Sequence, residues 1–220
     1  MPNPAIAYCL TQFFKTLKKS IFLGLSAALV LVLSSFLLPA DGYKVGDKVM
    51  VFNLKNIDNK MVSLGHDASA KGYIVVFTCN TCPVAKAYEQ RIVELNKTYA
   101  PKGYPVIAIN ANDAGISPGD SFEQMQQRAI SKSYGFPYLL DATQEVAKTY
   151  GARSTPTIYV VKREGNDYVL AYHGAIDNNS NDAYAASTHY VAKAVDALLQ
   201  NKPVEVTSTK AIGCGIKWKM

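Results

Sequence analysis

The feature that most constrains this chain is a pair of cysteines placed between an apolar run and an amphipathic segment. Residues 73–78 are β-branched, aromatic or small, which indicates a buried strand. Cys79 and Cys82 follow, separated by two residues, and apolar side chains then recur at helical spacing over residues 84–99. This order predicts a strand, a turn and a helix, with both thiols at the start of the helix.

Two cysteines at this spacing can close a disulfide, and the N–H groups of a helix N-terminus favour a thiolate. Pro83 is preferred at the first helical position, which would make Cys82 the N-cap and the candidate nucleophile. The opposite order, in which Cys79 attacks, stays open. A zinc half-site would lack partners, because the chain has three His and no Cys/His cluster with zinc-ligand spacing. We therefore expect no metal and no cofactor.

Strands and helices alternate along most of the remaining chain. Further strands are predicted at 49–54, 60–64, 106–111, 138–140, 157–161 and 169–172, and further helices from 121 to near 134, at 144–150 and at 184–199. Ser121, a predicted N-cap with Gln124 three residues on, would begin a helical insertion between strands. The pattern predicts an α/β fold: a three-layer sandwich with a mixed central sheet, an N-terminal β-hairpin and a helical insertion.

Residues 1–40 predict a signal peptide or an N-terminal membrane anchor. The apolar run 21–38 is about long enough to cross a bilayer as a helix. Lysines precede it and none follows closely, so the positive-inside rule places residue 41 onward outside the cytoplasm. Cleavage and retention both stay open. We expect an extracytoplasmic protein of the bacterial periplasm or cell envelope, held to the membrane through residues 21–38 if they are not cleaved.

Length and charge narrow the function classes. A chain of 220 residues suits one folded domain, predicted at 41–200, with a tail at 201–220. Of the 23 Lys and Arg, three lie in residues 1–40, which leaves 20 against 17 acidic side chains. This balance argues against a nucleic-acid surface.

Two segments resemble the thioredoxin-like redoxins. Residues 75–83, Val-Val-Phe-Thr-Cys-Asn-Thr-Cys-Pro, resemble the active strand and turn of that superfamily, and residues 141–161 are similar to its second signature. The similarity covers roughly residues 45–199. It implies that Pro156 is cis and lies against the cysteine pair. It also implies that Thr155 presents its backbone to an incoming substrate as an added strand.

The active turn departs from thioredoxin and resembles the peroxiredoxin-like (AhpC/TSA-type) branch with a CxxC. Counted from Phe77, Cys82 takes the position of the first thioredoxin cysteine. The run also resembles that of peroxiredoxins, whose Phe-Thr-x-x-Cys-Pro carries the peroxide-attacking cysteine directly before a proline, although residues 77–83 contain one residue more before the same Cys-Pro ending. An arginine near that cysteine would help to polarise peroxide. Arg153 is the candidate, and a solvated turn residue is the other interpretation.

The tail adds a further cysteine. Cys214 lies between Gly213 and Gly215, which predicts a mobile and accessible thiol. It would resolve a mixed disulfide or a sulfenic acid at Cys82. The other interpretation is a spare thiol on a tail docked by Trp218.

Three functions stay open. The first is a thiol-disulfide oxidoreductase that exchanges disulfides with extracytoplasmic proteins through Cys79 and Cys82. The second is a thiol peroxidase with antioxidant activity, in which Cys82 attacks peroxide. The third is a redox-inactive binding module in which the pair is a permanent bridge. The expected partners are protein thiols and disulfides or peroxide, and the oligomeric state is unknown.

Overall fold

The computed structural model describes residues 42–182 and 185–220. The predicted signal peptide or anchor, residues 1–40, lies outside them. Over the two described ranges, the structure has no helix with both the length and the apolar character needed to cross a membrane.

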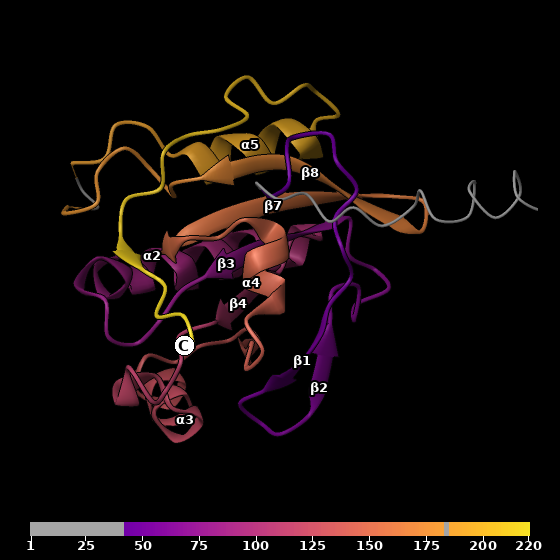
Figure 1. Ribbon diagram of the computed structural model, residues 1–220. Coiled ribbons are helices and arrows are strands. Elements are labelled where there is room, and N and C mark those ends of the chain that lie inside the picture. The colour runs from indigo at the N-terminus through magenta and orange to yellow at the C-terminus, as the bar shows by residue number, and fades with distance from the viewer. Residues whose placement is uncertain (1–41, 183–184) are drawn as a thin grey trace, which may run out of the picture. The chain divides into compact units, whose positions relative to one another are not determined.

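A mixed seven-stranded sheet forms the centre of the fold (Figure 1). Its strands are β1 (Asn53–Asn56), β2 (Met61–Ser63), β3 (Gly72–Phe77), β4 (Val106–Asn110), β5 (Tyr138–Leu140), β7 (Thr157–Glu164) and β8 (Asp167–Gly174). Their order is β2-β1-β5-β4-β3-β7-β8. Strands β3, β4 and β5 are parallel, whereas β1–β2, β1–β5, β3–β7 and β7–β8 are antiparallel. The predicted mixed sheet and N-terminal hairpin are confirmed.

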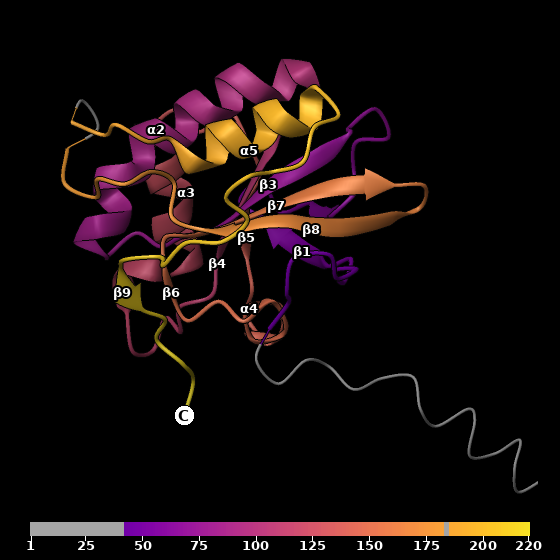
Figure 2. The same ribbon diagram turned by 90° about the horizontal axis from the view of Figure 1, so that it is seen from above.

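Helices cover both faces of this sheet. They are α2 (Pro83–Tyr99), α3 (Phe122–Ser131), α4 (Glu145–Tyr150) and α5 (Tyr190–Leu199), with short 3-10 turns η1 (Ala100–Lys102) and η2 (Pro118–Asp120). Figure 2 shows α2 and α5 side by side, and both pack with α3 on one face, whereas α4 packs on the other. The α/β/α three-layer sandwich is confirmed.

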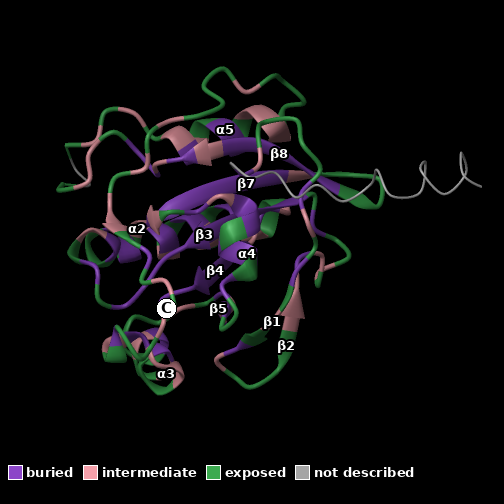
Figure 3. Ribbon diagram, viewed as in Figure 1, coloured by how far each residue is buried: buried purple, intermediate pink, exposed green. Residues whose placement is uncertain are grey.

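Strand β3, which leads directly into the cysteine pair, is buried on both of its faces. Val75 and Phe77 point into the core under α4, and Ile74 and Val76 into the core under α2. All four are fully buried, as the colouring of Figure 3 shows for this strand. A strand buried on both faces needs a continuous apolar run, which is the pattern that precedes Cys79.

The start of α3 agrees with the prediction, whereas the start of the closing helix differs from it. Ser121 caps α3 as predicted, and its hydroxyl accepts from the Gln124 N–H at 3.4 Å. The closing helix begins at Tyr190, not at residue 184. The side-chain oxygen of Asn178 accepts from the N–H groups of Ser187 and Thr188 at 3.0 and 3.1 Å, which holds these two residues in the irregular segment before the helix.

The C-terminal tail forms an element that the sequence did not predict. Strands β6 (Ser154–Thr155) and β9 (Cys214–Gly215) make a separate antiparallel pair, with Thr155 opposite Cys214. The two strands lie side by side in Figure 2. The expectation of a mobile and accessible Cys214 is therefore corrected: its backbone pairs with Thr155, and the residue is only partly exposed.

Candidate active site

Strand β3 and helix α2 bring the cysteine pair to one place. Cys79 and Cys82 are both free thiols, and each is only 3% exposed. Pro83 is the first residue of α2 and Cys82 is its N-cap, as predicted, with its sulfur accepting from the Ala85 N–H at 3.5 Å. The helix therefore directs first-turn N–H groups at the sulfur of Cys82.

Thr155 contacts both cysteines. Its hydroxyl oxygen lies 3.1 Å from the sulfur of Cys79, and its carbonyl oxygen accepts from the Cys82 thiol at 3.3 Å. The peptide bond from Thr155 to Pro156 is cis, and both residues are buried. The structure thus brings all four of these predicted site residues together.

Cys214 completes a cluster of three thiols. Its backbone N–H donates to the sulfur of Cys82 at 3.3 Å, and its side chain packs against the cysteine pair. The two thiols also affect each other's acidity. Cys82 is therefore enclosed between its own helix start, Thr155 and the tail.

The environment separates the acidities of the three thiols. Burial works against ionisation of Cys82, but hydrogen bonds from the Cys214 thiol and from nearby backbone N–H groups outweigh it, so the pKa of Cys82 is lowered from 9.0. Burial raises the pKa of Cys79. The pKa of Cys214 rises to about 11, first because its thiol donates to Cys82. Cys82 is the first of the three to become a thiolate, which makes it the nucleophile that the geometry favours.

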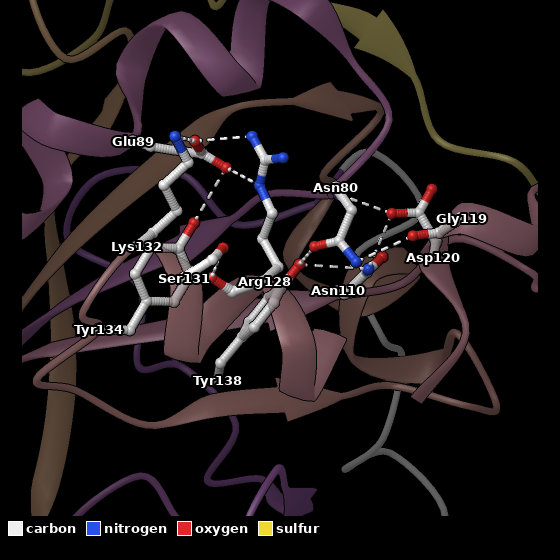
Figure 4. Close-up of polar contacts among 10 residues, drawn as sticks. All are labelled: Asn80, Glu89, Asn110, Gly119, Asp120, Arg128, Ser131, Lys132, Tyr134 and Tyr138. Atoms are coloured by element: carbon white, nitrogen blue, oxygen red, sulfur yellow. Dashed lines mark hydrogen bonds and ion pairs between the residues drawn. The ribbon is translucent and has the colours of Figure 1, made fainter. Parts of the chain in front are cut away.

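A buried carboxylate holds the turn between the cysteines, and Figure 4 shows part of its network. Asp120, in η2, is fully buried. Its oxygens accept from the Asn80 N–H (2.6 Å), the Thr81 hydroxyl (2.8 Å), the Ser117 hydroxyl (2.7 Å) and the side-chain amides of Asn110 (3.1 Å) and Asn112 (2.9 Å). Burial opposes ionisation of Asp120, but these hydrogen bonds lower its pKa overall. Asn80 and Thr81 are the two residues between the cysteines, so Asp120 fixes their turn.

A second buried carboxylate fastens α3 to α2. Glu89 accepts from Arg128 Nε at 2.5 Å and Nη2 at 2.8 Å, and from the Tyr134 hydroxyl at 3.2 Å (Figure 4). Lys132 lies at 3.8 Å from the same carboxylate. Sequence reasoning missed both Glu89 and Asp120. Asp120 lies in the polar stretch between β4 and α3, where no periodic pattern marks a buried carboxylate.

The remaining candidate, Arg153, lies beside the tail. It is exposed and lines a hollow of about 200 Å³ with Lys148 and Trp218. Its carbonyl accepts from the Ile216 N–H at 3.0 Å. Among residues 42–182 and 185–220, no group of three or more His, Cys, Asp or Glu side chains could hold a metal ion.

Comparison with known proteins assigns this chain to a family. The profile of the AhpC/TSA family matches residues 45–166. A crystal structure of an uncharacterised conserved protein from Geobacillus kaustophilus is 38% identical, with a TM-score of 0.75 over 80% of this chain and 93% of that one. A hypothetical protein from Sinorhizobium meliloti 1021 is 33% identical, with the same TM-score over 81% and 96% of the two chains.

A curated relative carries a functional name. The thiol-disulfide oxidoreductase ResA of Bacillus thuringiensis subsp. konkukian is 25% identical over 122 residues, which are 56% of this chain. The matched segment covers 66% of that relative, slightly less than two thirds of its length. Together these similarities identify a thioredoxin-like fold with redox relatives.

Proposed function

The chain belongs to the AhpC/TSA family, and we propose that it is a thiol-disulfide oxidoreductase acting on exported proteins through Cys79 and Cys82. The observation that carries this proposal is the sulfur of Cys82. It caps a helix, its pKa is lowered, and a second thiol lies three residues away on the same turn. A cysteine whose pKa is lowered, beside a resolving thiol, is the arrangement that disulfide exchange requires.

The exchange proceeds in two balanced steps. The Cys82 thiolate attacks one sulfur of a partner disulfide, the partner S–S bond breaks, and the released partner sulfur takes up a proton. The Cys79 thiolate then attacks the sulfur of Cys82, which releases the second partner thiol and leaves a Cys79–Cys82 disulfide. The partner is reduced by two electrons and the pair is oxidised by two. The same steps in reverse oxidise a partner dithiol.

The two thiols suit these different roles. Burial keeps Cys79 protonated while Cys82 attacks, since it raises the pKa of Cys79. The hydroxyl of Thr155, 3.1 Å from the Cys79 sulfur, stabilises the Cys79 thiolate by hydrogen bonding when the second step needs it. Thr155 is thus a positioning residue for the pair.

The location proposed for this reaction is outside the cytoplasm. The lysines before the apolar run 21–38 and their absence just after it favour export of the folded part. Disulfide exchange with other proteins also suits an oxidising compartment, where protein disulfides persist. Residues 21–38 would tether the site to the membrane if they are retained.

One observation favours a second candidate function, a thiol peroxidase. The tail leaves Cys82 only 3% exposed, and hydrogen peroxide needs far less room than a folded partner. In this chemistry the Cys82 thiolate attacks one peroxide oxygen, the O–O bond breaks, and a sulfenic acid and hydroxide form. A second thiol, Cys79 or Cys214, then condenses with the sulfenic acid and releases water.

A rate comparison decides between these functions. The reduced full-length chain is mixed with an unfolded protein disulfide or with hydrogen peroxide, and loss of each thiol is timed by alkylation and mass mapping, with Cys82→Ser as the control. Fast loss with the protein disulfide and slow loss with peroxide supports the oxidoreductase. Fast loss with peroxide and slow loss with the protein disulfide supports the peroxidase. If neither oxidant causes loss of thiols, the redox-inactive binding module is supported.

A further inference from the structure

The C-terminal strand occupies the edge of the cysteine site. Strand β9 pairs antiparallel with β6, so Cys214 lies opposite Thr155, the residue that contacts both Cys79 and Cys82. A free strand edge is where an extended peptide can add by backbone pairing. Here residues 213–215 of the chain itself fill that edge.

The fit of this strand depends on one glycine. A Cβ atom on Gly213 would lie 1.9 Å from the carbonyl oxygen of Thr155 and 3.1 Å from the nitrogen of Pro156. Any larger residue would force the two backbones apart. By contrast, a Cβ on Gly215 would meet nothing nearer than the carbonyl oxygen of Arg153 at 3.9 Å. The two glycines that flank Cys214 therefore form a matched pair, one tight and one open.

Contacts beyond β9 anchor the strand in place. Ile216 is 5% exposed and packs into the core under α4. The Lys217 N–H donates to the side-chain oxygen of Asn112 at 2.9 Å. The side chain of Gln144 donates to the Lys217 carbonyl and accepts from the Lys219 N–H, both at 2.8 Å. These contacts hold residues 216–219 in a defined position on the folded domain.

We propose that Cys214 is a third catalytic thiol, which closes a disulfide with Cys82 while residues 213–215 occupy the partner-docking edge. This proposal rests on the proposed function, since it requires a reactive Cys82. A disulfide of a partner or of a small thiol first forms a mixed disulfide with Cys82 and releases one thiol. The Cys214 thiolate then attacks the sulfur of Cys82, the mixed disulfide breaks, and the second thiol leaves with a proton.

This arrangement gives Cys82 two alternative resolving thiols. Cys79 approaches from within the turn, and Cys214 approaches from the tail, on the side where an external partner would bind. Since the tail and a partner strand would pair with the same edge, the Cys82–Cys214 disulfide would hold the site closed. Reduction of that disulfide by an external dithiol, which is itself oxidised to a disulfide, would restore both thiols and free the tail to leave.

The Cys79→Ser variant of the full-length chain isolates this step. It is reduced, treated with oxidised glutathione and mapped over time by mass spectrometry. We expect a transient glutathione adduct on Cys82, followed by a Cys82–Cys214 disulfide and release of two glutathione thiols. An adduct that persists at Cys82 while Cys214 stays free overturns the inference and leaves the proposed function standing. If Cys82 forms neither an adduct nor a disulfide, the proposed function fails, and the inference fails with it.

The glycine pair tests the docked geometry in the same background. We expect Gly213→Ala to slow resolution of the adduct at least tenfold, since a misplacement of reacting groups by about 1 Å costs up to roughly 100-fold in rate. Gly215→Ala should resolve at the parent rate. Circular dichroism and the unfolding midpoint of both variants check that the main fold is intact. Equal resolution rates in the two variants overturn the claim that the docked strand positions Cys214.

Discussion

The backbone nitrogen of Cys214 lies 3.3 Å from the sulfur of Cys82, although 132 positions separate the two residues. The same sulfur also accepts from the Ala85 N–H at the start of α2. Two N–H groups from distant parts of the chain therefore converge on one thiol. Because each of them stabilises the thiolate, the acidity of Cys82 depends on the docked tail as well as on its own helix.

The first prediction concerns this acidity. In the wild-type protein the Cys82 thiol should titrate below its ordinary pKa of 9.0, so its alkylation rate should reach half of its plateau below pH 9. Cys214→Ala removes the side-chain donor, and the midpoint should then shift upward. Cys214→Ser keeps a donor and should shift it less. A midpoint that is the same in wild type and Cys214→Ala would contradict the role given to the tail.

The second prediction concerns Thr155. Thr155→Val removes the hydroxyl that lies 3.1 Å from Cys79 and keeps the backbone carbonyl that faces Cys82. The Cys79 thiolate then loses one hydrogen bond, worth about 1 kcal/mol, so the Cys79-dependent resolving step should slow about fivefold. The initial attack by Cys82 should keep its rate. Single-turnover kinetics in a Cys214→Ser background, which leaves Cys79 as the resolving thiol, separate the two steps. Equal slowing of both would refute the assignment.

The third prediction concerns the buried carboxylate of Asp120. Asp120→Asn replaces the carboxylate that accepts from five donors with a neutral amide that carries donors of its own, so we expect a loss of about 2–3 kcal/mol in unfolding free energy at pH 7, measured by urea denaturation. The pKa of Asp120 is lowered from 3.8 in the folded protein. Its stabilising contribution is therefore present above about pH 4 and is lost as pH falls through the lowered folded pKa.

This linkage supplies the control for Asp120. The difference in unfolding free energy between wild type and Asp120→Asn should shrink as pH falls below about 4, because Asp120 of the unfolded wild-type chain then takes up a proton while the folded carboxylate, whose pKa is lowered, is still ionised. A difference that stays constant from pH 7 to pH 3 would show that the charge of Asp120 contributes nothing, and that only side-chain shape matters.

The fourth prediction concerns the contact between α2 and α3. Arg128→Met leaves the buried Glu89 carboxylate without its two-pronged partner and should destabilise the fold by about 3–5 kcal/mol. Lys132→Ala is the matched control, since Lys132 lies farther from Glu89 and is half-exposed, so its loss should cost less than about 1 kcal/mol. Thermal or urea unfolding of both variants measures the contrast. Similar losses would argue against a dominant Glu89–Arg128 pair.

Local pattern was enough to predict the core of the fold and the start of α2. The apolar run before Cys79 reports burial on both faces of β3, and Pro83 marks the first turn of the helix. These features depend on residues close together in the chain. The helix boundary at Tyr190 was missed because Asn178 binds the N–H groups of Ser187 and Thr188, nine and ten residues on, in competition with helical pairing, and helical periodicity does not reveal these bonds.

The polar parts of the site depend on long-range contacts. Asp120 lies 40 positions from Asn80, and its five donors come from three separate segments. The docking of Cys214 against Thr155 depends on the register of two residues at the end of the chain. No periodic signal marks either contact, although the two glycines around Cys214 mark a place of close backbone approach. The sequence therefore identified the three thiols, but it could not predict that the tail packs Cys214 against Thr155 and Cys82.

The central claim is that Cys82 is the attacking thiol, and trapping of a mixed disulfide tests it most directly. Two full-length variants, Cys79→Ser with Cys214→Ser and Cys82→Ser with Cys214→Ser, each retain one thiol of the site and cannot resolve an adduct. Both are exposed to an unfolded protein disulfide at pH 7, and the adducts are mapped by mass spectrometry. We expect rapid accumulation of a mixed disulfide on Cys82 and little mixed disulfide on Cys79. Faster capture by Cys79 would contradict it.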